Sequence, residues 1–180
     1  MNGVVRRVVD WLRGDPLRHA DEILVGNYRL ETRLANQLRR HAERFVGYPA
    51  AHRDLLTLAT RAAEAARDLA TTIERRGGRL PATAPDLDEA RTDWERLVAD
   101  REALREAPER YLGDAYAVER DHPEVSALLL GIRARKARDY RALVKLLAGF
   151  ERAVLDQPDE SPAAAGALEA LAGVPSAGGP

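Results

Sequence analysis

Three kinds of residue are missing or scarce in this chain of 180 residues. There is no cysteine, which excludes disulfides, thiolate metal sites and redox thiols. Aromatic residues make up only 5%, whereas β-sheet proteins are rich in aromatic and β-branched residues. Lys136 and Lys145 are the only lysines, so arginine carries nearly all the positive charge. What remains abundant is Ala, Leu, Arg and Glu, a composition typical of an all-α protein.

The chain also lacks an excess of charge of one sign and any long apolar run. Its net charge is −1, which is no electrostatic footprint for a nucleic acid. No apolar stretch reaches the length of a membrane span, and Arg6, Arg7 and Asp10 interrupt the apolar residues at the start. We therefore expect a soluble cytoplasmic protein that binds no nucleic acid.

Apolar residues recur at helical spacing in four stretches, about 16–45, 50–76, 87–121 and 123–156. Pro49 is preset for the first turn of the second stretch, and Gly77 with Gly78 is typical of a helix C-terminus. The sequence therefore predicts an all-α four-helix bundle over residues 16–156. Residues 1–15 are expected to form a short amphipathic helix, and the Pro/Ala/Gly-rich residues 157–180 a flexible tail.

Two features between residues 77 and 121 leave the bundle topology open. The segment "GGRLPATAPD" reads as an extended connection that barely spans the bundle length, so both an up-down-down-up and an up-down-up-down order are possible. Pro108 either kinks one long helix or begins a second one, because proline removes a backbone donor and clashes with the preceding turn.

Three ionisable residues fall on the apolar stripes, where the helices should meet. Glu31 lies in the repeat of the first helix, and Lys136 and Asp139 lie in that of the last. Bare carboxylates are costly to bury, so a lysine on the same level would supply the compensating charge. The sequence leaves three interpretations open: a buried ionic cluster, side chains that reach solvent at a helix edge, or a residual metal site.

Three segments together resemble the ferritin-like superfamily in its rubrerythrin- and bacterioferritin-related forms, over about residues 20–150. They are "LETRLANQLRRHAERF", "LLTLATRAAEAARDLATTIERRGGRLP" and "DHPEVSALLLGIRARKARDYRALVKLLA". The resemblance implies a bundle that holds two iron or manganese ions. One Glu comes from each of two helices, and a Glu-x-x-His pair comes from each of the other two.

Carried onto this chain position by position, the metal-ligand pattern is largely lost. Glu31 matches the glutamate of the first helix, and Glu109 is the best match in the third. The Glu-x-x-His pairs of the second and fourth helices fall on Ala62 with Ala65 and on Lys136 with Asp139. Both histidines are therefore absent, and a protonated lysine repels a cation.

We therefore expect Glu31, Lys136 and Asp139, with Glu109 and a hydrogen bond from Asn27, to form an ionic cluster in place of the metals. The leading hypothesis is a non-catalytic bundle without cofactor, acting as a binding or structural protein. Such a protein would be a homo-oligomer, most simply a homodimer, because exposed faces of these bundles commonly pair.

Two other functions stay open. One is a diverged di-iron or di-manganese oxidase or peroxidase that uses Glu31, Glu109 and Asp139. The other is a docking module that reaches a larger assembly through its C-terminal tail. The histidines offer little chemistry: His41 and His52 with Glu43 could make a site at the bundle end, but surface histidines are the simpler expectation because no two share close ligand spacing.

Overall fold

The computed structural model describes residues 16–82 and 90–150 and confirms the all-α four-helix bundle. Its helices are α2 (Pro16–Arg44), α3 (Pro49–Arg75), α4 (Asp93–Val118) and α5 (Pro123–Leu147). The closest pairs are α2 with α3 and α4 with α5, each joined by a short turn. The predicted N-terminal helix and C-terminal tail lie outside the described residues.

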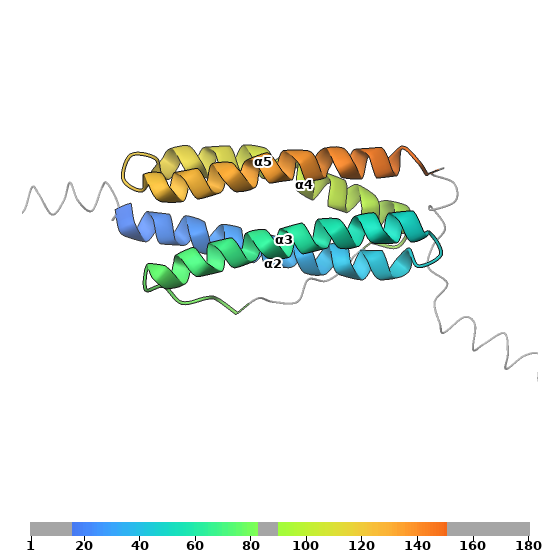
Figure 1. Cartoon of the computed structure of the whole chain (residues 1–180), viewed down its shortest axis with the longest axis horizontal. Helices are drawn as coiled ribbons and strands as arrows, with labels where there is room; N and C mark the ends of the chain where they lie inside the picture. Colours follow the sequence, from blue (N-terminus) through green and yellow to red (C-terminus); the bar gives the residue numbers. More distant parts are fainter. Residues whose placement is uncertain (1–15, 83–89, 151–180) are drawn as a thin grey trace, which may run out of the picture.

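Side-chain bonds between the two hairpins fix the direction of every helix. They join Asn27 to Asp114 and His41 to Asp100 across α2 and α4, and Arg61 to Asp139 and Asp68 to Arg135 across α3 and α5. Helix α4 is therefore antiparallel to α2, and α5 is antiparallel to α3. Because the short turns also make α3 antiparallel to α2 and α5 antiparallel to α4, the order is up-down-down-up. Figure 1 shows the consequence: α3 ends at one end of the bundle, and α4 begins at the other.

Local sequence determines where most helices begin and end. Pro49 is the first residue of α3, and Gly77, with φ at 79°, ends that helix while the N–H of Gly78 donates to the carbonyl of Ile73 at 2.9 Å. The described part of α4 begins at Asp93 rather than near residue 87, because Thr92 and Glu95 form a reciprocal capping box. The predicted end of the last helix near residue 156 is wrong, since α5 ends at Leu147 in a turn that includes Gly149.

Pro108 lies inside α4 and does not begin a separate helix. Because proline has no backbone N–H, the helix loses one internal hydrogen bond at this point. In Figure 1 the first half of α4 is inclined to the bundle axis, and its second half runs alongside α5. The proline therefore acts within one continuous helix.

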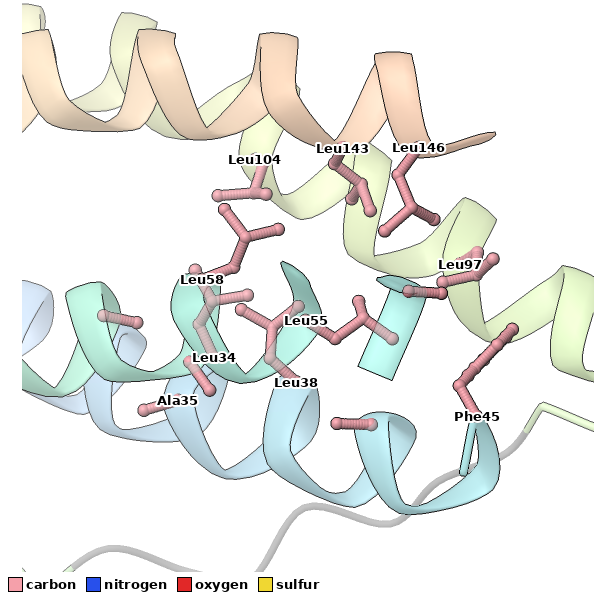
Figure 2. Close-up of a cluster of buried hydrophobic side chains, with 14 of the residues drawn as sticks. Leu34, Ala35, Leu38, Phe45, Leu55, Leu58, Leu97, Leu104, Leu143 and Leu146 are labelled. Carbon is pink, nitrogen blue, oxygen red and sulfur yellow. The ribbon is translucent and has the colours of Figure 1, made fainter. Parts of the chain in front are cut away.

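The interior consists of two apolar clusters. One lies at the end where α2 turns into α3, and Figure 2 shows leucines of all four helices directed into it, among them Leu38, Leu58, Leu104 and Leu143. The other lies at the α4–α5 turn and is centred on residues such as Leu24, Leu69, Leu129 and Ile132. Along α5 the cluster at the α4–α5 turn ends at Ile132, and the cluster at the α2–α3 turn begins at Leu143. The buried residues of α5 between these two positions are Lys136 and Asp139.

Candidate functional site

A layer of ionisable side chains separates the two apolar clusters. We call it the polar layer and define it as Glu31 from α2, Tyr111 from α4, and Lys136 and Asp139 from α5. All four are at most 1% exposed. Helical spacing places them here, because Lys136 and Asp139 are three residues apart and so share one face of α5. The structure thus excludes the interpretation in which Lys136 and Asp139 reach solvent at a helix edge.

Glu31 uses its two carboxylate oxygens for two different partners. The Lys136 ammonium nitrogen lies 2.5 Å from Oε2, and the Tyr111 hydroxyl donates to Oε1 at 2.8 Å. Sequence reasoning missed the polar role of Tyr111, because helical spacing gives only its place on the apolar side of the third helical stretch. The hydroxyl and the ammonium together bind one buried carboxylate from two helices.

Lys136 and Asp139 are incompletely partnered. Lys136 carries three N–H donors, but Glu31 is its only ion-pair partner among the described residues. Asp139 Oδ1 accepts from Arg61 Nη1 of α3 at 3.0 Å, while Asp139 Oδ2 has no hydrogen-bond partner within the described part of the chain. Arg61 was not predicted as a member: its side chain is 47% exposed and reaches inward from the surface.

Burial controls the proton equilibria of the polar layer. Desolvation raises the pKa of Glu31 above its ordinary value of 4.5, and the Lys136 charge, then the hydrogen bonds from Lys136 and Tyr111, oppose that rise. The neighbouring Asp139 charge raises the Glu31 pKa further. Desolvation also raises the pKa of Tyr111, followed by the repulsion between a phenolate and Glu31. Tyr111 therefore stays protonated and acts as a donor.

Two residues predicted for the cluster lie elsewhere. Glu109 is exposed on α4, so its predicted membership in a buried cluster is wrong. Asn27 is buried, but its amide nitrogen donates to Asp114 at 2.7 Å and to the carbonyl of Ile23, not to a member of the polar layer. Counting from the turns gives the level of a residue along the bundle, but it does not give the face of the helix.

The two positions where the ferritin pattern would require a Glu-x-x-His pair in α3 are Ala62 and Ala65. Both are buried in the bundle, one at the edge of each apolar cluster. The Arg61–Asp139 and Asp68–Arg135 bonds place them opposite the Lys136–Asp139 segment of α5. Their small methyl groups leave room at this level for Lys136, one of the largest fully buried side chains.

The polar layer does not fit a dimetal centre. It offers the carboxylates of Glu31 and Asp139, no imidazole, and an ammonium group in contact with one of the two acids. Within residues 16–82 and 90–150, no group of three or more His, Cys, Asp or Glu side chains is arranged to hold a metal ion. Divalent iron or manganese prefers several carboxylate or imidazole ligands, which these side chains do not supply.

A second buried polar site lies between α2 and α4, nearer the α2–α3 turn. Asp100 is completely buried and accepts from the Gln37 side chain at 2.7 Å through Oδ1, while its Oδ2 lies 2.8 Å from His41 Nδ1. The expectation of surface histidines is thus wrong for His41, which is 2% exposed. His52 binds the carbonyl of Ala42 at 2.8 Å and caps the turn.

Neither a protein-family model nor a curated protein sequence matches this chain. The resemblance to the ferritin-like superfamily therefore rests on the three quoted segments and stays a prediction. Within the described residues, no helix combines the length and the apolar character that crossing a bilayer requires.

Proposed function

We propose that this protein is a ferritin-like four-helix bundle that works without metal, as a binding or structural protein. The observation that carries this proposal is the Lys136–Glu31 ion pair, whose atoms lie 2.5 Å apart in the interior. In this proposal the ammonium group takes the place of the cations that relatives would hold. Redox chemistry at a dimetal centre is then lost, and the scaffold remains.

Two further observations support a ferritin-like ancestry. The up-down-down-up order, with α3 ending and α4 beginning at opposite ends, has the single long crossover of ferritin-like folds. The positions matched to metal ligands in α2, α3 and α5 also lie on one level of the bundle. The alternative of a diverged oxidase is weaker, because Glu109, one of its three proposed ligands, is exposed.

We expect a homo-oligomer in the cytoplasm, from the composition and from the tendency of such bundles to pair. Tyr116 on α4 and Leu130 on α5 are large exposed hydrophobic residues that a second copy would cover. A docking role of residues 157–180 concerns a segment outside the described residues.

Metal analysis of the full chain, purified from medium supplemented with iron and manganese, tests the proposal directly. We expect less than about a tenth of an ion per chain in the wild-type protein. Near-stoichiometric iron or manganese would overturn the proposal.

Two variants with the same change of charge sharpen the test. Lys136→Glu places a third carboxylate next to Glu31 and Asp139, and we expect it to bind Mn²⁺ and to melt at a higher temperature when Mn²⁺ is added. Lys145→Glu is the matched control, because Lys145 is the only other lysine and is exposed. Metal retention by Lys145→Glu but not by Lys136→Glu would contradict the assignment of the cation position.

A further inference from the structure

A groove between α3 and α5 is a candidate binding site that the polar layer does not account for. Its volume is about 410 Å³, within the range of small-molecule sites. The floor includes Leu58 of α3 and Leu146 of α5, both members of the apolar cluster at the α2–α3 turn, and Figure 2 shows them on these two helices. Phe150 lies at the end of the groove near the same turn.

Two cations line this groove from opposite helices. Arg61 donates one of its five N–H groups to Asp139 and makes no other hydrogen bond with a described residue. Lys145 is exposed and forms no ion pair within the described part of the chain. Donors at the edge of an apolar groove favour a ligand that combines an apolar body with an anionic head.

The positions along α3 give the ligand a direction. Asp54 also lines the groove, seven residues and therefore about 10 Å before Arg61. Lys145 lies close to the level of Asp54, because the Arg61–Asp139 and Asp68–Arg135 bonds place α5 antiparallel to α3. The Asp54 carboxylate offsets the Lys145 charge at that end, so a ligand carboxylate is best held at the Arg61 end, where the guanidinium can bind it in a bidentate geometry. The apolar chain would then extend over Leu58 and Leu146 toward Phe150.

We propose that the α3–α5 groove binds a medium-chain carboxylic acid, with Arg61 holding the carboxylate. Arg61 would then serve two acids at once, Asp139 on its inner side and the ligand on its outer side. This inference goes beyond the metal-free function proposed above and does not depend on it, because no member of the polar layer lines the groove.

Titration calorimetry of the full chain with decanoate, below its micelle concentration, tests the proposal. We expect one saturable site per chain, and we expect decylamine, which has the same chain but a cationic head, to bind at least about tenfold more weakly. Absence of saturable decanoate binding, or equal binding of the two amphiphiles, would overturn the proposal.

A pair of variants locates the site without disturbing Asp139. Ala142→Leu fills the groove and should weaken decanoate binding about tenfold, whereas Ala134→Leu, at an exposed position of the same helix that does not line the groove, should leave it unchanged. Arg61→Lys keeps the positive charge at this position and should therefore weaken decanoate binding less than Arg61→Gln, which removes it. Equal effects of the two leucine variants would show that decanoate binds elsewhere.

Two further outcomes would assign the groove to another occupant. If Leu168→Asp with Leu171→Asp in the full chain strengthens decanoate binding about tenfold, the C-terminal segment competes for the groove and the proposal fails. If Ala142→Leu dissociates a dimer in sedimentation experiments while Ala134→Leu does not, the groove is an interface between copies. We expect neither change.

Discussion

The bundle neutralises buried carboxylates in two different ways, at two levels of the same α2–α4 interface. Asp100 has a partner for each oxygen, and these partners are the side chains of Gln37 and His41. Glu31 depends on the Lys136 charge and on one hydroxyl, from Tyr111. The Asp100 carboxylate binds an amide and an imidazole side chain, whereas the Glu31 carboxylate faces an ammonium group and a hydroxyl.

This difference determines what each site tolerates. A buried charge that is well hydrogen-bonded loses one interaction at a time, and each loss costs about 1–3 kcal/mol. A buried ion pair is weak evidence for stability as a whole, but removal of one partner leaves an uncompensated charge. The polar layer should therefore be the more sensitive site.

Lys136→Met should have the largest effect on stability. It removes the charge that faces Glu31 and should lower the free energy of unfolding by about 3–5 kcal/mol at neutral pH. Urea denaturation followed by circular dichroism measures the change. Lys145→Met is the control, since Lys145 is exposed and its loss should cost less than about 0.5 kcal/mol.

The double variant Lys136→Met with Glu31→Leu tests whether the lost stability comes from the uncompensated Glu31 charge. Replacing both ionic partners by apolar residues is often neutral, so most of the lost stability should return. If Lys136→Met alone leaves the midpoint of unfolding unchanged, the ammonium does not compensate a buried charge, and the proposed role of Lys136 is wrong.

Asp100→Ala should have the next largest effect. The variant leaves the Gln37 amide and the His41 ring without their buried acceptor, and we expect a loss of about 2–4 kcal/mol in the same measurement. Asp54→Ala, at an exposed position, is the matched control and should change stability by less than about 0.5 kcal/mol. A larger loss from Asp100→Ala than from Lys136→Met would reverse the comparison between the two sites.

Tyr111→Phe removes the hydrogen bond that Glu31 accepts from α4. Hydrogen bonds to charged groups contribute about 1.5–3 kcal/mol, and we expect a loss near the lower limit because Lys136 still faces Glu31. Tyr116→Phe is the control on the same helix, since Tyr116 is 64% exposed. If both variants unfold at the wild-type urea concentration, the Tyr111 hydroxyl contributes nothing to Glu31.

The sequence predicts which positions lie on the apolar side of a helix, but it does not predict which long side chains reach the interior from the surface. Helical periodicity places Glu31, Lys136 and Asp139 on the apolar stripes, and the structure then decides between burial and exposure at a helix edge in favour of burial. Periodicity cannot locate Arg61, whose backbone position is at the surface and whose long side chain reaches Asp139. Glu109 was assigned by level and not by face.

The Asp100–His41 site was missed for a related reason. His41 lies beside the apolar repeat of α2, where polar residues usually face water, whereas Asp100 lies within the repeat of α4, three residues after Leu97 and four before Leu104. That spacing indicates burial of Asp100, but only the pairing of α2 with α4 shows that the two side chains meet. The pairing in turn depends on the topology, which the sequence left open between two orders. A buried polar contact between helices far apart in sequence therefore requires the fold before it can be recognised.

The most gradual expected effect is the pH dependence that Glu31 adds to stability. Because burial raises the Glu31 pKa above 4.5, the folded state binds more protons than the unfolded state above that pH. The stability of the wild type relative to Glu31→Gln should thus be greatest at low pH. It should decrease as the pH rises from 4.5 through the raised pKa, by at most about 1.4 kcal/mol per pH unit. Urea denaturation of both proteins between pH 4 and 8 measures this difference, and an increase with pH would mean that the Lys136 charge outweighs the burial of Glu31.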